Sequence, residues 1–291
     1  IVIDSTLSLI AKSWITTEKA VNTTAEILEW ISHRNKTVAV DIRKSKLSES
    51  SFWFYDELQG TIHSQNNSFF SIVGFEKQVE NGTVIRQPMI LQQEIGFLGI
   101  ICKEIDGVIH FLMQAKIVPG NLNKIQLSPT IQATKSNFTQ KHGGARPPYL
   151  EYFEQASRYE IVVDQIQSEQ SSRFYKKRNR NILIRVEEEI PVLPSHKWMT
   201  LRQIKALMRV DNLVNMDTRT VLSCIPFCKL QLSQAQDEEL KHLCSNPALY
   251  RSIFTPSEQN LLPNLYQYIN NYKMFQNTQG SLVPLHQLEG W

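Results

Sequence analysis

The sequence has no long apolar run, few cysteines and no extended run of one charge. No stretch of its 291 residues reaches the ~18 consecutive apolar residues of a membrane-spanning helix, so we expect no membrane segment. The four cysteines form no paired framework of the kind found in disulfide-rich secreted domains, which predicts reduced thiols and a cytoplasmic location. The chain also lacks an initial Met, and we expect that its natural start was lost or not included.

One alternative use of the cysteines is a zinc site. The spacing of Cys224 and Cys228, with His242 and Cys244 further along, gives four potential zinc ligands. The second pair lacks the usual ligand spacing, however, and thiols are commonly buried as small hydrophobic groups. We therefore predict no metal site.

The chain is nearly balanced in charge, with 31 Lys and Arg against 28 Asp and Glu and a net charge of +3. This balance does not favour nucleic acid as the main partner. The only dense basic cluster lies at residues 176–180, where four of five side chains are cations. Such an isolated cluster fits the phosphate groups of a small ligand as well as it fits nucleic acid.

The remaining composition is that of an ordinary globular protein, with 42% hydrophobic and 20% charged residues. From Phe52 onward, aromatic and β-branched runs alternate with turn signals such as Asn-Gly at 81–82 and Asp-Gly at 106–107, which predicts a mostly antiparallel sheet. Apolar residues recur at helical spacing before residue 34 and again after Thr200, a possible N-cap, so both segments are predicted to be helical. The fold class is therefore α/β, a mixed, mostly antiparallel sheet flanked by helices, followed by a helical connector from residue 229.

A polar, turn-rich stretch at residues 114–137 stands out because it follows directly on the apolar strand signal at 108–113. It carries amides, hydroxyls and a lysine, which are not typical of a hydrophobic core. Such groups, delivered on loops at strand ends, suit a ligand with many hydrogen-bonding groups, such as a sugar or a nucleotide sugar. The alternative is a long surface loop.

The order of short motifs makes the sequence resemble the NDP-hexose 2,3-dehydratases, enzymes of deoxysugar biosynthesis. The resemblance covers roughly residues 52–227. The motifs that carry it are QP at 87–88, QAK at 114–116, PGN at 119–121, QLSPT at 126–130, QAT at 132–134, SN at 136–137, SEQ at 168–170, KRNRN at 177–181 and NMDTR at 215–219.

This resemblance implies a Nudix-like fold, two tandem copies per chain, a homodimer and a dTDP-linked 4-keto-6-deoxyglucose substrate. It divides the chain into an N-terminal helical extension at 1–50, a dehydratase domain at 51–228, and a connector at 229–291 that ends in the start of a missing second repeat. The implied activity is a dTDP-4-dehydro-6-deoxy-D-glucose 2,3-dehydratase, a carbon–oxygen lyase that needs no cofactor.

The chain departs from the family pattern at three positions as well as in length. Val118 stands where the family usually has a Glu before Pro-Gly, Ser171 where a Gly is common, and Ile85 where a Trp is usual. Loss of the Glu leaves open a second function, a noncatalytic nucleotide-sugar-binding half of such an enzyme. A Nudix-like hydrolase is a third alternative, but no Nudix box is present.

Three residues are candidates for the chemistry that the resemblance implies. Lys116 would stabilise the enolate or anchor the diphosphate. Glu169 and His142 are the titratable groups nearest to the matched motifs, and either would act as base or acid.

The remaining candidates would bind the substrate. Arg178 and Arg180 flank Asn179 and point to the same side of an extended strand, so both can reach a diphosphate. Amides and a hydroxyl of the polar stretch would hold the sugar or the thymine; they are Gln114, Asn121, Gln126, Thr130, Gln132 and Asn137.

Overall fold

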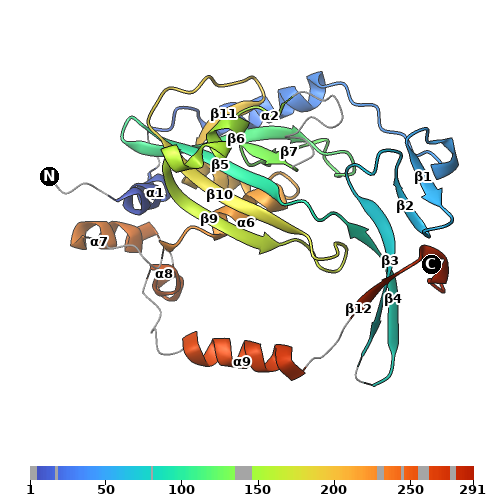
Figure 1. The fold of residues 1–291 in the computed structure, drawn as a ribbon. Helices are drawn as coiled ribbons and strands as arrows, with labels where there is room; N and C mark the ends of the chain where they lie inside the picture. Colours follow the sequence, from blue (N-terminus) through green and yellow to red (C-terminus); the bar gives the residue numbers. More distant parts are fainter. Residues whose placement is uncertain are drawn as a thin grey trace.

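Two β-sheets organise the computed structural model, which describes residues 5–16, 19–79, 81–134, 146–227, 233–243, 246–254, 262–275 and 280–291 (Figure 1). The larger sheet has the strand order β11-β6-β5-β10-β9, with β7 added to β6 and β8 added to β5. Strands β5 and β10 run parallel, and the other pairs run antiparallel. The predicted mixed, mostly antiparallel sheet is confirmed. Its strands are β5 (Gly96–Ile105), β6 (Val108–Ile117), β7 (Ile125–Ser128), β8 (Ile131–Ala133), β9 (Glu160–Ser168), β10 (Arg178–Val186) and β11 (His196–Thr200).

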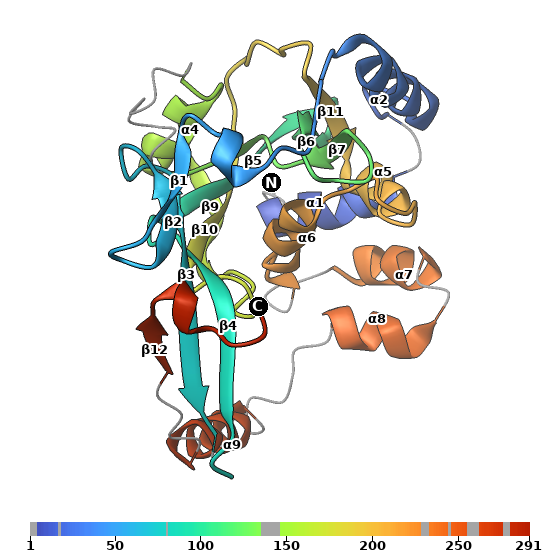
Figure 2. The same ribbon diagram turned by 90° about the vertical axis from the view of Figure 1, so that its right-hand side faces the viewer.

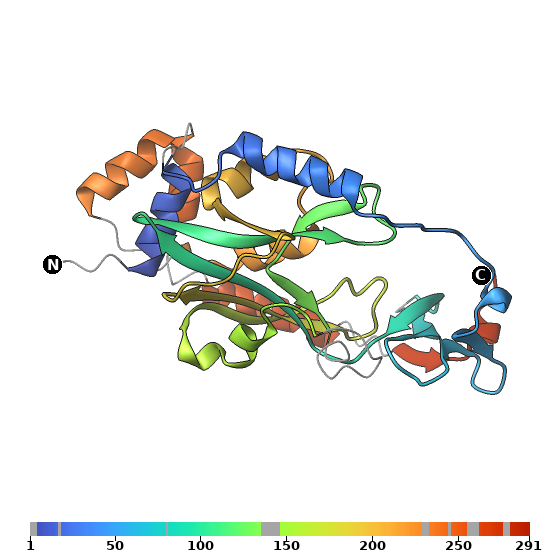
Figure 3. The ribbon, with the colours of Figure 1, turned by 90° about the horizontal axis from the view of Figure 1, so that it is seen from above.

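The second sheet is antiparallel and projects to one side of the first (Figure 3). It follows the order β1-β2-β3-β12, and β4 also pairs with β3. Its strands are β1 (Trp53–Asp56), β2 (Thr61–Ser64), β3 (Ser71–Gln78), β4 (Val84–Leu91) and β12 (Gly280–Val283). The last strand thus returns from the C-terminal end of the chain to the first strands of the sheet region.

The Asp-Gly signal at 106–107 forms the turn that its sequence predicts. Asp106 and Gly107 have φ angles of 51° and 80°, the left-handed values of a tight hairpin turn. They join β5 to β6 with Ile105 opposite Val108. The short hairpin fixes the register as far as Ile101 opposite Leu112. Beyond that point β5 pairs with β8, and the end of β6 pairs with β7 and β11.

Helices cover both faces of the larger sheet, as the sequence predicts (Figure 2). Helices α1 (Thr6–Ile15), α2 (Thr24–Thr37), α5 (Leu201–Leu207) and α6 (Met216–Ser223) pack on one face, and α4 (Leu150–Glu154) packs on the other. Strand alternation supplies both cores: Leu183 faces the first group, whereas Ile182 and Ile184 face α4. Thr200 caps α5, with its hydroxyl accepting from the Gln203 N–H, so the predicted cap is confirmed.

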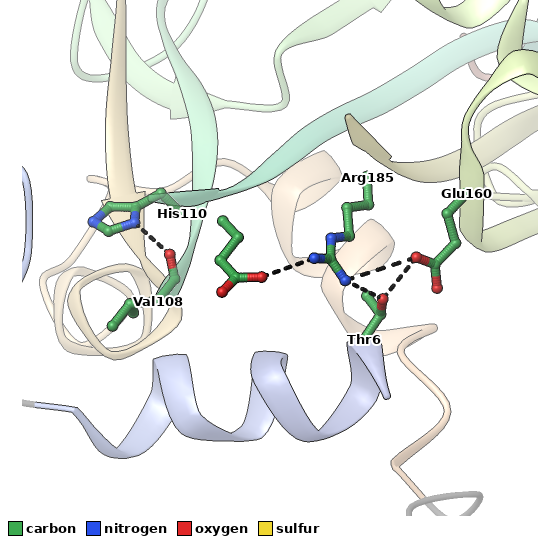
Figure 4. A network of polar contacts seen from close by, with 6 residues as sticks. Thr6, Val108, His110, Glu160 and Arg185 are labelled. Atoms are coloured by element: carbon green, nitrogen blue, oxygen red, sulfur yellow. Dashed lines mark hydrogen bonds and ion pairs between the residues drawn. The ribbon is translucent and has the colours of Figure 1, made fainter. Parts of the chain in front are cut away.

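Polar contacts anchor the N-terminal segment to the larger sheet (Figure 4). At the start of α1, the Thr6 hydroxyl donates to Glu160 at 2.7 Å and accepts from Arg185 at 2.8 Å. Arg185 also donates to Glu104 at 2.8 Å, so strands β5, β9 and β10 all meet α1 at this point. After the helix, the Val21 N–H donates to the buried His110 ring, whose other nitrogen faces the Val108 carbonyl at 2.9 Å.

These contacts bear on the predicted extension at 1–50. Ile10 of α1 and Ile27 of α2 belong to the same apolar core as the sheet. Within the described part of the extension, α1 and α2 pack on the larger sheet, whereas residues 38–46 form no helix. Where a domain boundary falls remains a prediction.

The described C-terminal segments that precede the last strand are mostly helical. Its helices are α7 (Gln234–Leu243), α8 (Pro247–Phe254) and α9 (Leu262–Phe275), and short 3-10 turns occur at Leu47–Glu49, Ala156–Arg158 and Leu285–Gln287. Residues 282–291, predicted to open a second repeat, include part of β12, and the Trp291 indole donates to the Arg86 carbonyl of β4. Within the described ranges, no helix is both long and apolar enough to cross a membrane.

Candidate functional site

A polar cavity of about 290 Å³ opens at the edge of the larger sheet where the parallel strands β5 and β10 begin. The end of β6, strand β8, the loop after β9 and the start of α6 complete its wall. Its lining combines two carboxylates, two lysines and amides with the rings of two phenylalanines. The lining residues are Gln92, Gly96, Phe97, Leu98, Lys116, Gln132, Ala133, Thr134, Glu169, Phe174, Lys177, Asn179 and Asp217.

Asp217 is the carboxylate that its surroundings perturb most clearly. Burial, the largest cause, and the nearby charge of Glu169 together raise its pKa to about 6, against the opposing effects of Lys116 and of a hydrogen bond with Gln132. Asp217 lies in the first turn of α6, where the helix dipole favours a negative charge. The raised pKa therefore means that desolvation outweighs the favourable charges around the group.

Asn215 orients this carboxylate through the start of the helix. Its side-chain oxygen accepts from the Thr218 N–H at 2.9 Å, which caps α6. Its side-chain nitrogen donates to the Gln132 amide oxygen at 3.0 Å. Because that oxygen is engaged, Gln132 has its N–H groups left to offer to Asp217.

Lys116, near the end of β6, brings a positive charge to the same cavity. Burial lowers its pKa, and the charge of Asp217 partly offsets this shift. A desolvated ammonium group interacts more strongly with a nearby negative oxygen than an exposed one does, because the local dielectric constant is lower. Lys116 and Asp217 thus lie close enough in one cavity for each to shift the pKa of the other.

Glu169 is held on the opposite chain segment, in the loop after β9. Its oxygens accept from the Asn179 amide at 2.7 Å and from the Gln170 N–H at 3.1 Å. Gly96 stands opposite Asn179 in the parallel register, and a Cβ at this position would lie 3.0 Å from the Asn179 amide oxygen. The glycine thus leaves the space in which Asn179 can hold Glu169.

Lys177 lines both this cavity and a second hollow. It is buried, its ammonium group donates to the Glu94 carbonyl, and burial lowers its pKa against the charges of Glu94 and Glu169. The second hollow has a volume of about 580 Å³ and shares Glu169, Phe174 and Lys177 with the first. Its other lining residues are Phe75, Met89, Ser168, Ser171, Tyr175, Lys176 and Arg178.

Aromatic rings and cations meet in the second hollow. The Phe75 and Tyr175 ring centroids are 5.9 Å apart, and the Lys176 ammonium lies 5.2 Å from the Tyr175 centroid. The loop that carries Tyr175 is tied to β4 of the second sheet, because the Tyr175 N–H donates to the Ile90 carbonyl at 2.9 Å. The hollow therefore lies between the two sheets.

The structure brings together some of the residues that the sequence predicts for the site. Lys116, Glu169, Gln132 and Asn179 line the polar cavity, and Arg178 lines the second hollow. His142 and Asn137 lie outside the described residues.

Other predicted residues are engaged elsewhere. The buried Thr130 hydroxyl donates to the Leu112 carbonyl at 2.5 Å and accepts from the Ile101 N–H at 2.9 Å, so it joins strands of the sheet. Asn121 donates to Gln126 at 2.9 Å, and Gln126 donates to the Asn212 carbonyl at 2.8 Å, at the far end of the β6–β7 hairpin.

Arg180 and Gln114 also have structural partners. Arg180 makes two hydrogen bonds of 2.6 and 2.7 Å to Asp164 and lies over the Phe97 ring. The Gln114 carbonyl accepts from the Ser128 hydroxyl at 3.4 Å, and Gln114 does not belong to the cavity wall.

The two residues missed from sequence are Asp217 and Lys177. Both lie inside motifs that carry the family resemblance, NMDTR and KRNRN. Membership in these motifs was the sequence signal that could have identified them. Their burial next to Lys116 and Glu169 depends on non-local packing. Among the described residues, no three His, Cys, Asp or Glu side chains are grouped so that they could hold a metal ion.

Comparison with known proteins identifies relatives along most of the chain. A sequence model of the family described as NDP-hexose 2,3-dehydratase matches residues 24–225. A dTDP-4-dehydro-6-deoxy-alpha-D-glucopyranose 2,3-dehydratase of Saccharopolyspora spinosa is 40% identical over 273 residues, which make up 92% of this chain and 55% of that protein. A protein of the same name from Amycolatopsis orientalis is 38% identical over 225 residues, or 75% of this chain and 48% of that protein. The chain thus spans about half the length of these curated relatives.

Solved structures of Nudix and related hydrolases resemble the chain more distantly. An ADP compounds hydrolase matches 57% of this chain and 89% of its own, with a TM-score of 0.38 and 11% identity. The Nudix hydrolase RenU from M. Smegmatis matches 52% of this chain and 97% of its own, with a TM-score of 0.30 and 13% identity. Likenesses of this size carry no further argument.

The raised pKa of Asp217 predicts a pH dependence of stability. The folded protein holds a proton on this carboxyl up to about pH 6, whereas the unfolded chain releases it near the ordinary value of 3.8. The contribution of Asp217 to the free energy of unfolding should therefore be fully present below pH 4 and be lost as the pH rises through 6. Asp217→Asn should remove this loss of stability. At pH 8 the variant should be more stable than the wild type by about 1–2 kcal/mol. The gain is not larger because the substitution also removes the negative charge that faces Lys116.

Urea unfolding of both proteins at pH 4, 6 and 8 measures the effect. The exposed Asp211 provides the matched control, because Asp211→Asn should leave the pH dependence of stability as it is in the wild type. A difference between Asp217→Asn and wild type that is the same at pH 4 and pH 8 would contradict the assignment.

Proposed function

Because the chain belongs to the NDP-hexose 2,3-dehydratase family, we propose that it removes water across C2 and C3 of dTDP-4-dehydro-6-deoxy-D-glucose, as a carbon–oxygen lyase. The observation that carries the proposal is the partly buried group of Lys116, Glu169 and Asp217 in one polar cavity. The curated relatives bear the name of this activity. The reaction is an elimination that uses acid, base and charge stabilisation, which these residue types can supply.

The ketone at C4 makes the proton on C3 acidic. A base takes that proton, negative charge develops on the C4 oxygen, and the C2 hydroxyl leaves with a proton as water. The resulting enol then becomes a 3,4-diketone. The C–H and C–O bonds break with no net oxidation, so we propose that the reaction uses no redox cofactor and no metal ion.

We propose that Lys116 stabilises the developing enolate. A cation aimed at an oxygen that gains charge is worth ~3–4 kcal/mol in the transition state. The desolvation that lowers the Lys116 pKa also strengthens this interaction, because less water competes for the charge. Its neighbours Glu169 and Asp217 leave two carboxyl groups for proton transfer.

The adjoining hollow supports the nucleoside diphosphate part of the substrate. Lys176 and Arg178 bring positive charge to it, and Phe75 and Tyr175 offer aromatic surface for a base. Since the two hollows share Phe174 and Lys177, one ligand can place its sugar in the smaller cavity and its diphosphate in the larger. We propose cytoplasmic action on such a ligand, which fractionation of the producing cells would check.

The second function, a noncatalytic binding half, was suggested by Val118. This residue follows β6 in the hairpin, its N–H donates to the Lys124 carbonyl at 3.3 Å, and it is not among the residues lining either hollow. The loss of a Glu there leaves the lysine and carboxylates of the cavity in place. We therefore favour the enzyme, and the turnover assay below separates the two functions.

Replacing Lys116 with Met should lower kcat for loss of the C2 hydroxyl about 10²–10³-fold, because the enolate loses its cation. NMR of the 4-keto sugar nucleotide during incubation with the protein measures this rate. Lys124→Met, on the exposed hairpin, is the control and should match the wild type. Unchanged kinetics in Lys116→Met would remove the lysine from the site, and wild-type binding without turnover would instead favour the noncatalytic function.

Replacing Arg178 with Ala should weaken binding of dTDP about tenfold, because a charge-assisted contact with the diphosphate is lost. Arg180→Ala should weaken it less than about threefold, because this guanidinium is already paired with Asp164. Isothermal titration calorimetry with dTDP measures both affinities. Equal losses in the two variants would restore the symmetric role predicted from the sequence.

We also propose that the protein forms a homodimer, and helix α9 offers a surface for it. Leu265, Tyr268, Ile269 and Tyr272 recur at helical spacing on α9 and are 53%, 70%, 39% and 57% exposed. Among the side chains described in this helix, none is charged. In a symmetric dimer the same surface of both subunits is in contact, so an uncharged surface avoids like-charge repulsion. Tyrosine is also enriched in protein interfaces.

Light scattering coupled to size-exclusion chromatography tests this surface. The wild type should elute with the mass of a dimer at micromolar concentration, and Tyr268→Ser combined with Ile269→Ser should shift it to a monomer. Asn264→Ser combined with Asn271→Ser changes the polar face and should leave the dimer intact. A monomeric wild type, or a dimer that survives the apolar double substitution, would exclude this interface.

A further inference from the structure

We propose that Asp217 is the acid that protonates the departing C2 hydroxyl and that Glu169 is the base that takes the C3 proton. This assignment rests on the proposed function and divides the acid and base roles between the two carboxyl groups of the cavity. The sequence placed Glu169 in either role and did not single out Asp217.

The hydrogen bonds of Glu169 suit a base. Both of its oxygens accept, one from the Asn179 amide and the other from the Gln170 N–H, so the group is oriented as an ionised carboxylate would be. Asn179 is itself fixed in β10 opposite Gly96. A base held in one orientation can take a proton from a substrate carbon without first rearranging.

The hydrogen bonds of Asp217 suit an acid. Its amide partner Gln132 uses its oxygen to accept from Asn215 and its N–H groups to donate to Asp217. The O–H of a protonated Asp217 is therefore not taken up by Gln132 and can be offered to the substrate. Asn215 caps the same helix, so one side chain fixes both the position of Asp217 and the direction of its hydrogen bond.

Burial, helped by the charge of Glu169, raises the pKa of Asp217 toward neutral pH. The groups that act on it are Lys116 from β6 and Glu169 from the loop after β9, and the pKa of about 6 includes both. A general acid works best when its pKa lies close to the working pH. The negative charge of Glu169 favours the proton on Asp217, because two like charges in one cavity repel each other.

The protons balance over one turnover. The C3–H bond breaks and its proton goes to Glu169, while the C2–O bond breaks and the oxygen takes the proton of Asp217 to leave as water. Afterwards Glu169 is protonated and Asp217 is charged. Transfer of the proton from Glu169 to Asp217, directly or through solvent, restores the starting state.

A substrate whose leaving group needs no proton tests the acid role. The 2-deoxy-2-fluoro analogue of the 4-keto sugar nucleotide releases fluoride, a leaving group that departs without a general acid. Asp217→Asn should lower the rate on the natural substrate about 10²–10⁴-fold, yet stay within about tenfold of the wild type on the fluoro analogue. Glu169→Gln should be slow on both, because each elimination needs the base.

Fluoride release, read by fluorine NMR, and loss of the C2 hydroxyl, read by proton NMR, give the rates. Binding of dTDP by each variant confirms that it is folded, and Asp211→Asn serves as the matched control. If Asp217→Asn is equally impaired on both substrates, or impaired on neither, Asp217 is not the acid. If the wild type releases neither water nor fluoride, the proposed function itself fails.

Discussion

The parallel pairing of β5 with β10, inside a sheet whose other strands run antiparallel, is the constraint on which the site depends. Parallel neighbours begin at the same edge, so Gly96 and Asn179 lie side by side there. The ends of β6 and β9 bring Lys116 and Glu169 to the cavity at that edge. The cavity is therefore a consequence of strand direction.

Burying charged groups at this edge lowers the stability of the fold. The pKa shifts identify which groups are desolvated. Burial lowers the pKa of Lys116 and Lys177 and raises that of Asp217, so each of the three loses part of its hydration. A purely structural salt bridge could sit on the surface at lower cost. Several desolvated charged groups gathered in one cavity are expected of a site that uses charges in its chemistry.

Local signals in the sequence predicted local structure well. The Asp106-Gly107 turn and the Thr200 cap depend on neighbours along the chain, and both formed as expected. The polar motif around Thr130 carried two kinds of residue that sequence cannot separate: the Thr130 hydroxyl binds strands of the sheet, whereas Gln132, two residues on, reaches the cavity. Asp217 was missed because its burial arises from elements distant in sequence.

The C-terminal strand shows how far such non-local effects extend. Strand β12 pairs with β3 and places Gly280 against Phe75, where a Cβ would lie 2.1 Å from the ring. Phe75 is a wall of the larger hollow and lies beside Tyr175, whose loop continues into Lys177 and β10. A glycine about 200 residues from the ring in sequence thus sets the space that the ring occupies. The second sheet, which adds no carboxylate or lysine to the polar cavity, shapes the neighbouring hollow through this packing.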